Sequence, residues 1–268
     1  MPRTLRLPVV FLILIVAASL PQANAGADST LDTVIDRGRL VLGTSGNMPS
    51  MSFFDANGKV TGFDIDLARL MASIMEVKLE IRVMPFDQLL SALESGDVDI
   101  VISNMTITPR RNLRVAFVGP YMTSGKCVVT KDAALAKGEN RGDLNTDETS
   151  LAVLSGSTSA DFARELLPNA SLIKVQDYDE AAMLVKEDKA DGMLTDYPIC
   201  MATLKTHKDA GFVSVLSLLT YEPIGIALPA NDAQFINFTE NMLERLDKTN
   251  AFEELSKRWF GDIRLKKH

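Results

Sequence analysis

Segments with the pattern of a buried strand alternate with segments of helical periodicity along most of this chain. In the first half, the apolar run Leu40–Gly43 precedes apolar residues at helical spacing over Phe63–Ile74. In the second half, the apolar run Leu151–Leu154 precedes another helical pattern, and Gly192–Asp196 is predicted to be a further strand. Such alternation is typical of parallel sheets covered by helices on both faces. We therefore predict an α/β fold that binds ligands at the carboxyl ends of its strands.

Local signals predict where several elements begin and end. A helix opened by Asp87 is expected to end at Gly96, because glycine is the preferred residue after a helix. Asp177 and Glu180 have the spacing of a capping pair. The polar segment 132–149 is predicted to be a surface loop. Aromatic residues at helical spacing near the C-terminus are predicted to belong to the core.

The N-terminus predicts export. Two arginines precede the apolar run Val9–Ala18, and alanines occupy positions 23 and 25, which is the layout of a secretory signal peptide. A membrane-spanning helix needs about 20 apolar residues, more than this run contains. We expect residues 1–25 to be removed near Ala25, which leaves a mature protein in the periplasm that starts near Gly26. The cleavage site holds no cysteine that could carry a lipid.

The charge of the mature chain excludes some partners. Removal of residues 1–25 takes away two arginines and no acidic residue, so the formal charge falls from −7 to about −9. A protein this acidic is a poor ligand for nucleic acid or anionic lipid. We expect no nucleic-acid partner. The remaining length of about 240 residues suits two moderate domains.

Cysteine and histidine usage gives no metal site. The only histidines are His207 and His268, and no cluster has the spacing of metal ligands, so we expect neither a metal nor a cofactor. Cys127 and Cys200 lie in apolar surroundings, which suit buried thiols as well as a disulfide. The sequence leaves both possibilities open.

Three segments that follow predicted strands carry groups suited to a ligand. Ser103–Arg111 offers a threonine hydroxyl, loop amides and a guanidinium, which suit a carboxylate. Gly156–Thr158 opens a helix, where it suits an anion or serves as an ordinary cap. Asp196 can accept from an ammonium or cap the helix beginning at Tyr197-Pro198, and these two roles can coexist.

The order and spacing of several short motifs resemble the polar-amino-acid family of bacterial extracellular solute-binding proteins, which serve ABC importers. The resemblance covers nearly the whole mature chain. It rests on Gly62–Leu67, Gly96–Asp99, Met105–Arg111, Gly119–Tyr121, Gly156–Thr158, Thr195-Asp196 and Gly225–Ala227.

The resemblance implies a two-lobed, hinged α/β fold in which the chain crosses between the lobes near 121–126 and 221–225. Lobe 1 would comprise residues 26–121 and the return segment 225–268. Lobe 2, with the hinge segments, would comprise residues 122–224.

The resemblance also implies how an amino-acid-like ligand is held. Family members bind the α-carboxylate of the ligand with an arginine five positions after a serine or threonine. Thr106 and Arg111 match this pair, so Arg111 rather than Arg110 is the predicted ligand residue.

The other lobe and a neighbouring loop supply the remaining contacts. Ser157 and Thr158 match groups that reach the carboxylate from lobe 2. Asn104 matches a position whose backbone carbonyl accepts from the α-ammonium, and Asp196 matches the carboxylate that receives this ammonium.

Departures from the family pattern concern the ligand's side chain. Met48 stands where some relatives have an aromatic residue, whereas Phe86 retains a second aromatic wall. Where some relatives select the ligand with charged or strongly polar groups, this chain has Ser45, Leu154 and Thr195. These residues offer no fixed charge, which favours a ligand with an uncharged side chain.

Two alternatives to transport remain. The same fold is used by a periplasmic cyclohexadienyl dehydratase, which needs a positioned general acid, and Glu222 and Glu180 are the acids that could serve. The second alternative is a ligand-sensing module that docks on a membrane receptor. In the favoured reading the protein is a monomer, not an enzyme, and its partner is the membrane permease of an ABC importer.

Overall fold

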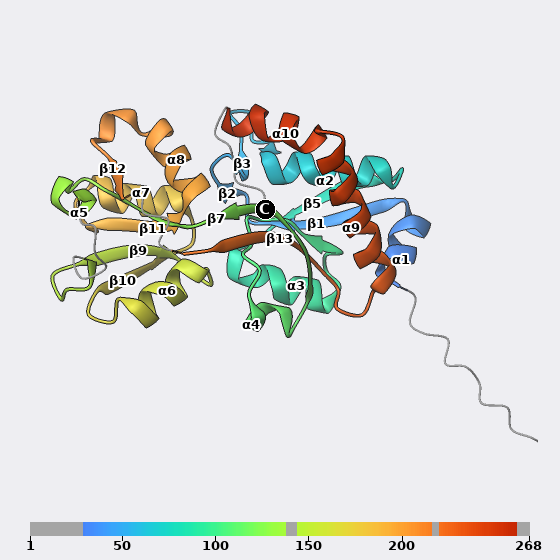
Figure 1. Cartoon of the computed structure of the whole chain (residues 1–268), viewed down its shortest axis with the longest axis horizontal. Coiled ribbons are helices and arrows are strands. Elements are labelled where there is room, and N and C mark those ends of the chain that lie inside the picture. Colours follow the sequence, from blue (N-terminus) through green and yellow to red (C-terminus); the bar gives the residue numbers. More distant parts are fainter. Residues whose placement is uncertain (1–28, 138–143, 216–219, 262–268) are drawn as a thin grey trace, which may run out of the picture.

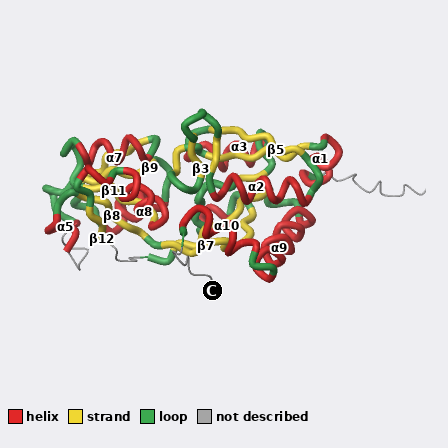
Figure 2. The backbone as a smooth tube through the Cα atoms, turned by 90° about the horizontal axis from the view of Figure 1, so that it is seen from above, coloured by secondary structure: helices red, strands yellow, loops and turns green. Residues whose placement is uncertain are grey.

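The computed structural model describes residues 29–137, 144–215 and 220–261, which form two lobes (Figure 1). Each lobe contains a five-stranded sheet, and a small three-stranded sheet of β2 (Asn47–Met48), β3 (Ser52–Phe54) and β4 (Val60–Thr61) adjoins the first. Figure 2 shows the lobes side by side from above. The expected two-lobed α/β fold is confirmed. The predicted signal peptide lies outside the described residues.

The first sheet has the strand order β5–β1–β6–β13–β7. In Figure 1, helices α2 and α10 lie on one side of it and α3 and α4 on the other. Its strands are β1 (Arg39–Thr44), β5 (Lys78–Val83), β6 (Ile100–Val101), β7 (Ala116–Ser124) and β13 (Glu222–Leu228). Its helices are α1 (Thr30–Arg37), α2 (Phe63–Ile74), the 3-10 turn η1 (Phe86–Gln88), α3 (Leu89–Ser95), α4 (Pro109–Asn112), α9 (Ala233–Lys248) and α10 (Ala251–Phe260).

The second sheet has the strand order β10–β9–β11–β8–β12. Helix α6 lies on the side opposite to α7 and α8 (Figure 1). Its strands are β8 (Lys126–Thr130), β9 (Ser150–Leu154), β10 (Ser171–Val175), β11 (Gly192–Asp196) and β12 (Val213–Val215). Its helices are α5 (Ala133–Lys137), α6 (Thr158–Leu166), α7 (Tyr178–Lys186), α8 (Tyr197–Thr206) and the 3-10 turn η3 (Lys208–Ala210).

Both sheets are mixed, so the prediction of parallel sheets is wrong for the strands at the crossings. β1 is parallel to β5 and β6, and β9 is parallel to β10 and β11. In contrast, β13 is antiparallel to β6 and β7, and β8 is antiparallel to β11 and β12. A strand that enters a sheet from the neighbouring lobe needs no helical crossover, and only such crossovers impose parallel pairing. The chain passes between the sheets from β7 to β8 and returns from β12 to β13.

Most local signals act as predicted. Gly96 ends α3 with φ of 78°, a left-handed conformation that glycine adopts without strain. The Asp177 carboxylate caps α7 by accepting from the Glu180 amide at 2.6 Å. The predicted loop 132–149 is wrong for Ala133–Lys137, which is helical because the Asp132 carboxylate accepts from the backbone amide of the second residue of α5.

The C-terminal helices return to the first lobe and close its core. Phe63, at the start of α2, is wholly buried and contacts Phe252 and Phe260 of α10, with ring centroids 5.4 and 5.5 Å apart. The Trp259 indole donates to the Asp66 carboxylate at 3.0 Å. The predicted core role of the C-terminal aromatic residues is confirmed. Phe235 and Phe252 are buried, and the partly buried Phe238, Trp259 and Phe260 pack against the core.

A disulfide joins Cys127 of β8 to Cys200 of α8, with Cα atoms 6.3 Å apart. Both residues are buried. This bond decides between the two possibilities that the sequence left open. It fixes α8 against its sheet four residues after Asp196, the N-cap residue of this helix.

We expect the double variant Cys127→Ala/Cys200→Ala to unfold with a free energy about 2–4 kcal/mol below that of wild type, because the bond restricts the unfolded chain. Urea titration followed by circular dichroism measures this difference. A thiol reductant should lower the wild-type midpoint and leave the double variant unchanged. Equal midpoints for the two proteins without reductant would contradict a stabilising bond.

Candidate functional site

The loops that follow the central strands of the two lobes meet in a cleft. Loops after β6 of the first lobe contact loops after β9 and β11 of the second. A cavity of about 1060 Å³ opens beside these contacts, and Phe86, Thr106, Arg111 and Thr158 are among its lining residues. Four of the predicted ligand-binding residues therefore share one cavity, at the position where α/β sheets bind ligands.

Arg111 extends from the first lobe to the second. The Thr108 hydroxyl accepts from the Arg111 amide at 3.1 Å and so caps the short helix α4. The guanidinium donates to the Thr106 carbonyl at 2.7 Å and to the Gly156 carbonyl of the other lobe at 3.0 Å. It lies 5.6 Å from the ring centroid of Phe86. Burial lowers the pKa of this guanidinium, and the nearby carboxylates oppose that effect.

Asn104 links the lobes through a strained loop position. Its φ of 46° is left-handed, and its amide donates to the Asp64 carboxylate at 2.7 Å. Its side-chain nitrogen donates to Asp196 of the second lobe at 3.2 Å. Among the described residues, its side-chain oxygen is buried without a hydrogen-bond partner. A buried acceptor without a partner is costly unless a ligand or water satisfies it.

Asp64 stabilises the loop that carries Asn104 by hydrogen bonding. Its carboxyl is wholly buried and accepts from the Tyr121 hydroxyl at 2.9 Å as well as from Asn104. Burial raises the pKa of Asp64 to about 7, although the two hydrogen bonds act in the opposite direction. The sequence placed Asp64 in a family motif and gave no sign of this supporting role.

Lys126 is a site residue that the sequence reasoning missed. Its side chain is wholly buried, and its ammonium donates to Asp196 at 2.7 Å and to the Thr158 hydroxyl at 2.6 Å. The Glu222 carboxylate lies 3.3 Å from the same nitrogen. The Thr158 hydroxyl contacts that carboxylate at 3.1 Å, and Thr220 donates to it at 2.9 Å.

A weak signal of this role exists in the sequence. Lys126 directly precedes an apolar strand, at one of the expected crossings. Its partner becomes visible only from the register of the second sheet, in which Lys126 stands opposite Asp196. Opposite charges in such cross-strand positions attract each other.

Helix α8 begins at Tyr197 as expected, with Asp196 at the N-cap position, but the Asp196 side chain makes no capping hydrogen bond. A capping role for this carboxylate is therefore wrong. The carboxylate instead turns to Lys126 and Asn104, because these donors satisfy it within the cleft.

The remaining predicted residues lie near the cleft without joining this cluster. Ser45 lines a second cavity between the lobes, of about 890 Å³. Met48 is buried in the small sheet, and Thr195 is buried in β11. The Ser157 hydroxyl caps α6 by accepting from the Ala160 amide at 3.1 Å.

The expectation that Ser45, Leu154 and Thr195 offer no fixed charge to the ligand's side chain stays a prediction. Elsewhere in the cleft, Lys126 and Glu222 place fixed charges next to Thr158. These two residues come from the crossings and not from the positions that the family pattern compares.

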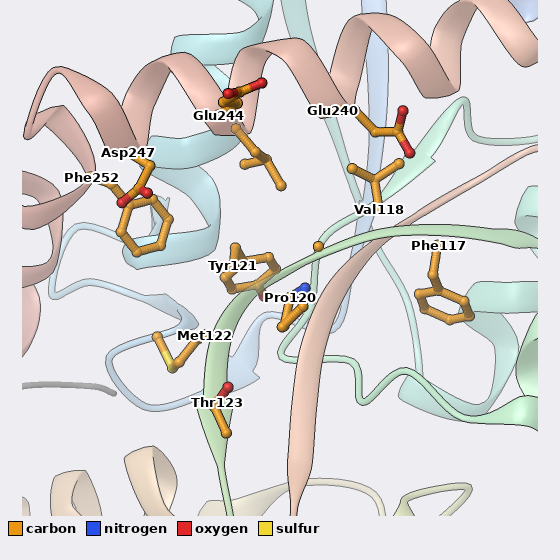
Figure 3. Close-up of a pocket in the computed structure, with 12 residues that line it drawn as sticks. Phe117, Val118, Pro120, Tyr121, Met122, Thr123, Glu240, Glu244, Asp247 and Phe252 are labelled. Carbon is orange, nitrogen blue, oxygen red and sulfur yellow. The ribbon is translucent and has the colours of Figure 1, made fainter. Parts of the chain in front are cut away.

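A further cavity, of about 360 Å³, lies away from the cleft between β7 and α9. Figure 3 shows Tyr121 and Pro120 on its strand side and Glu240 and Glu244 on its helix side. None of the predicted ligand-binding residues lines it. In the described part of the chain, no cluster of side chains could hold a metal ion, and no helix has the length and apolar character to span a membrane.

Comparison with known proteins identifies the family. The family model described as bacterial extracellular solute-binding proteins, family 3, matches residues 40–262. The chain belongs to this family. The resemblance inferred from its motifs is confirmed.

The solute-binding protein matches relatives over most of its length. The ABC transporter glutamine-binding protein GlnH of Bacillus subtilis (strain 168) is 26% identical, with 97% of each chain covered. The crystal structure of AncCDT-1, an ancestral amino acid-binding protein described as a precursor of cyclohexadienyl dehydratase, is 37% identical with a TM-score of 0.80, over 87% of this chain and 100% of that one. A putative ABC transporter binding component from Wolinella succinogenes DSM 1740, complexed with lysine, is 34% identical with a TM-score of 0.81, over 85% and 98%.

The raised pKa of Asp64 makes the stability of this solute-binding protein depend on pH. Between the unfolded value of 3.8 and about 7, the folded state retains a proton that the unfolded state has lost. The contribution of Asp64 to the free energy of unfolding is therefore full below about pH 4 and is lost as the pH rises through 7. In the Asp64→Asn variant, this dependence of stability on pH should be absent.

The test is urea unfolding of both proteins at about pH 4.5, 6 and 8. The free energy of unfolding of wild type minus that of the variant should fall by on the order of a few kcal/mol as the pH rises across this range. A difference that stays constant with pH would contradict a raised pKa.

Proposed function

We propose that this protein captures a small amino-acid-like ligand between its lobes and delivers it to the membrane permease of an ABC importer. One observation carries the proposal. Arg111 of the first lobe and Asp196 of the second belong to a single hydrogen-bonded cluster, joined through Thr106, Thr158 and Lys126. A zwitterion needs such opposite charges, one for each of its ends. The relatives GlnH and the Wolinella protein, which are named for glutamine or complexed with lysine, support this ligand class.

In the proposed complex, Arg111 holds the α-carboxylate by two parallel hydrogen bonds, and the Thr106 and Thr158 hydroxyls assist it. Asp196 and Asn104 receive the α-ammonium. Ser157 at the start of α6 would make a further contact to the carboxylate, with its hydroxyl turning from the Leu154 carbonyl to the ligand.

The ligand's side chain would then lie against the remaining predicted residues. Phe86 forms the aromatic wall of the cavity that it lines. Ser45, Met48 and Thr195 would form the other side of this subsite.

We also propose the lobe boundaries, the compartment and the assembly state. Lobe 1 comprises residues 26–121 and 225–268, and lobe 2 with the hinge segments comprises 122–224. Membership of an extracellular solute-binding family supports export after cleavage near Ala25. The protein then acts as a monomer in the periplasm.

We propose that the protein is not an enzyme. The observation that favours a dehydratase as the alternative is the similarity to AncCDT-1, which is described as a precursor of cyclohexadienyl dehydratase. Of the two candidate acids, Glu180 accepts from the Gln176 amide at the start of α7, and Glu222 faces Lys126. Incubation with prephenate and arogenate tests the alternative, and formation of a dehydrated, decarboxylated product would overturn the non-enzymatic proposal.

Ligand binding should stabilise the protein and close the lobes. A ligand that binds only the native state adds about 2.7 kcal/mol at 100 times its dissociation constant. A thermal-shift screen of the common amino acids and of dicarboxylates identifies such compounds. Small-angle scattering with the best compound should give a smaller radius of gyration, because hinge closure brings the lobes together. An unchanged radius despite saturation would remove the hinge mechanism.

Arg111→Ala and Asp196→Ala should each weaken binding of the screened amino acid by about 30-fold or more, because each leaves a ligand charge without its partner. Arg111→Lys should also bind poorly, since an ammonium cannot reproduce the planar fork. The exposed neighbour Arg110 supplies the control, and Arg110→Ala should bind nearly as wild type does.

Calorimetric titration of the four variants measures these effects. Loss of binding in Arg110→Ala but not in Arg111→Ala would show that the assignment is wrong by one residue. Normal binding by both Arg111→Ala and Asp196→Ala would mean that the ligand is not held as an α-amino acid.

A further inference from the structure

Lys126, Asp196 and Glu222 form a buried cluster of charges at the junction of the lobes. The side chain of Lys126 is wholly buried, and those of Asp196 and Glu222 are 8% and 9% exposed. The Lys126 ammonium donates to Asp196 and to the Thr158 hydroxyl, and it forms an ion pair with Glu222 at 3.3 Å. The protein itself therefore surrounds this ammonium with two carboxylates and a hydroxyl.

The cluster carries one more negative charge than positive charge. An ion pair of Lys126 and Asp196 alone would have no net charge, and Asp196 would then attract a ligand cation only weakly. Glu222 adds a second carboxylate to the same ammonium. Arg111 is a further cation that interacts electrostatically with Asp196 and Glu222, and a ligand carboxylate bound to Arg111 would take up its charge. An excess charge in a buried site is costly unless another charge compensates it.

Acceptors for a compensating ammonium are present on the side of the cluster that faces the first lobe. The Asn104 side-chain oxygen is buried and has no partner among the described residues. The Asn104 side-chain nitrogen already donates to the Asp196 oxygen that Lys126 does not contact. A ligand ammonium at this place would contact Asn104 and Asp196, whereas Glu222 contacts Lys126, Thr158 and Thr220.

We infer that Glu222 is a specificity-determining residue that offsets Lys126, so that the cluster retains one negative charge and selects α-amino acids over the same acids without the amino group. This inference rests on the proposed function and extends it. Glu222 does not contact the ligand in this proposal. It is a positioning residue that acts through Lys126 and so preserves the negative charge that Asp196 presents to the ligand. The two strands at the crossings supply the opposing groups, Lys126 from β8 and Glu222 from β13.

The test compares each amino acid with its counterpart that lacks the α-amino group. The pairs are lysine with 6-aminohexanoate and glutamine with glutaramate, titrated by calorimetry at about pH 7 in about 0.1 M salt. The wild-type protein should prefer the amino acid of at least one pair by about 30-fold or more.

Glu222→Gln should reduce this preference about 10-fold or more, chiefly through weaker binding of the amino acid, because the cluster becomes neutral. Glu222→Asp, which keeps the charge, should retain most of the preference. The double variant Lys126→Met/Glu222→Gln restores a single negative charge on Asp196, so its preference should return to within about threefold of wild type. The control is Glu254→Gln on the exposed surface of α10, which removes the same charge at a distance and should change nothing.

Equal losses for both members of a pair in Glu222→Gln would show a structural role and overturn the inference. Failure of the folded double variant to regain the preference would also overturn it. If the wild-type protein binds neither amino acid and no other amino acid in the screen, the proposed function is itself wrong and the inference falls with it. Circular dichroism and urea unfolding establish that each variant is folded.

Discussion

The pairing of β7 with β13 is the constraint on which the site depends. These strands are antiparallel, and their register sets Ser124 opposite Glu222 at the ends that point to the second lobe. Lys126 comes two residues after Ser124, so the same register brings Lys126 next to Glu222. A cluster of three buried charges would be costly in an arbitrary place. Here the backbone pairing of the two crossings fixes its geometry.

Local patterns predicted the parts of the fold that depend on neighbours in sequence. The apolar spacing over Phe63–Ile74 corresponds to α2 with the same bounds, because a helix buries residues three and four positions apart. Gly96 and Asp177 end and begin helices through contacts within a few residues. The family resemblance added the prediction of two lobes and assigned Thr106, Arg111 and Thr158 to one site. These three residues do line one cavity.

Contacts between distant segments could not be predicted in this way. Lys126 and Asp196 meet because β8 and β11 pair in one particular register, and a shift of one residue would turn the two side chains to opposite faces. The Cys127–Cys200 bond depends on how α8 packs on β8. The antiparallel direction of β13 likewise follows from its return between lobes. Sequence reasoning therefore predicted the residues of the candidate site that match the family pattern and missed the charges at the crossings.

The position of β13 has a consequence for how the chain acquires its structure during synthesis. This strand lies between β6 and β7, although about a hundred residues separate it from both in sequence. Until it emerges from the ribosome, β7 has no partner in the first sheet, and β6 presents an open edge. Phe63 likewise lacks its contacts with the aromatic residues of α10 until that helix has been synthesised. The second lobe is continuous in sequence and can assemble earlier, whereas the first remains an incomplete intermediate with exposed strand edges, the kind of species that aggregates or recruits chaperones.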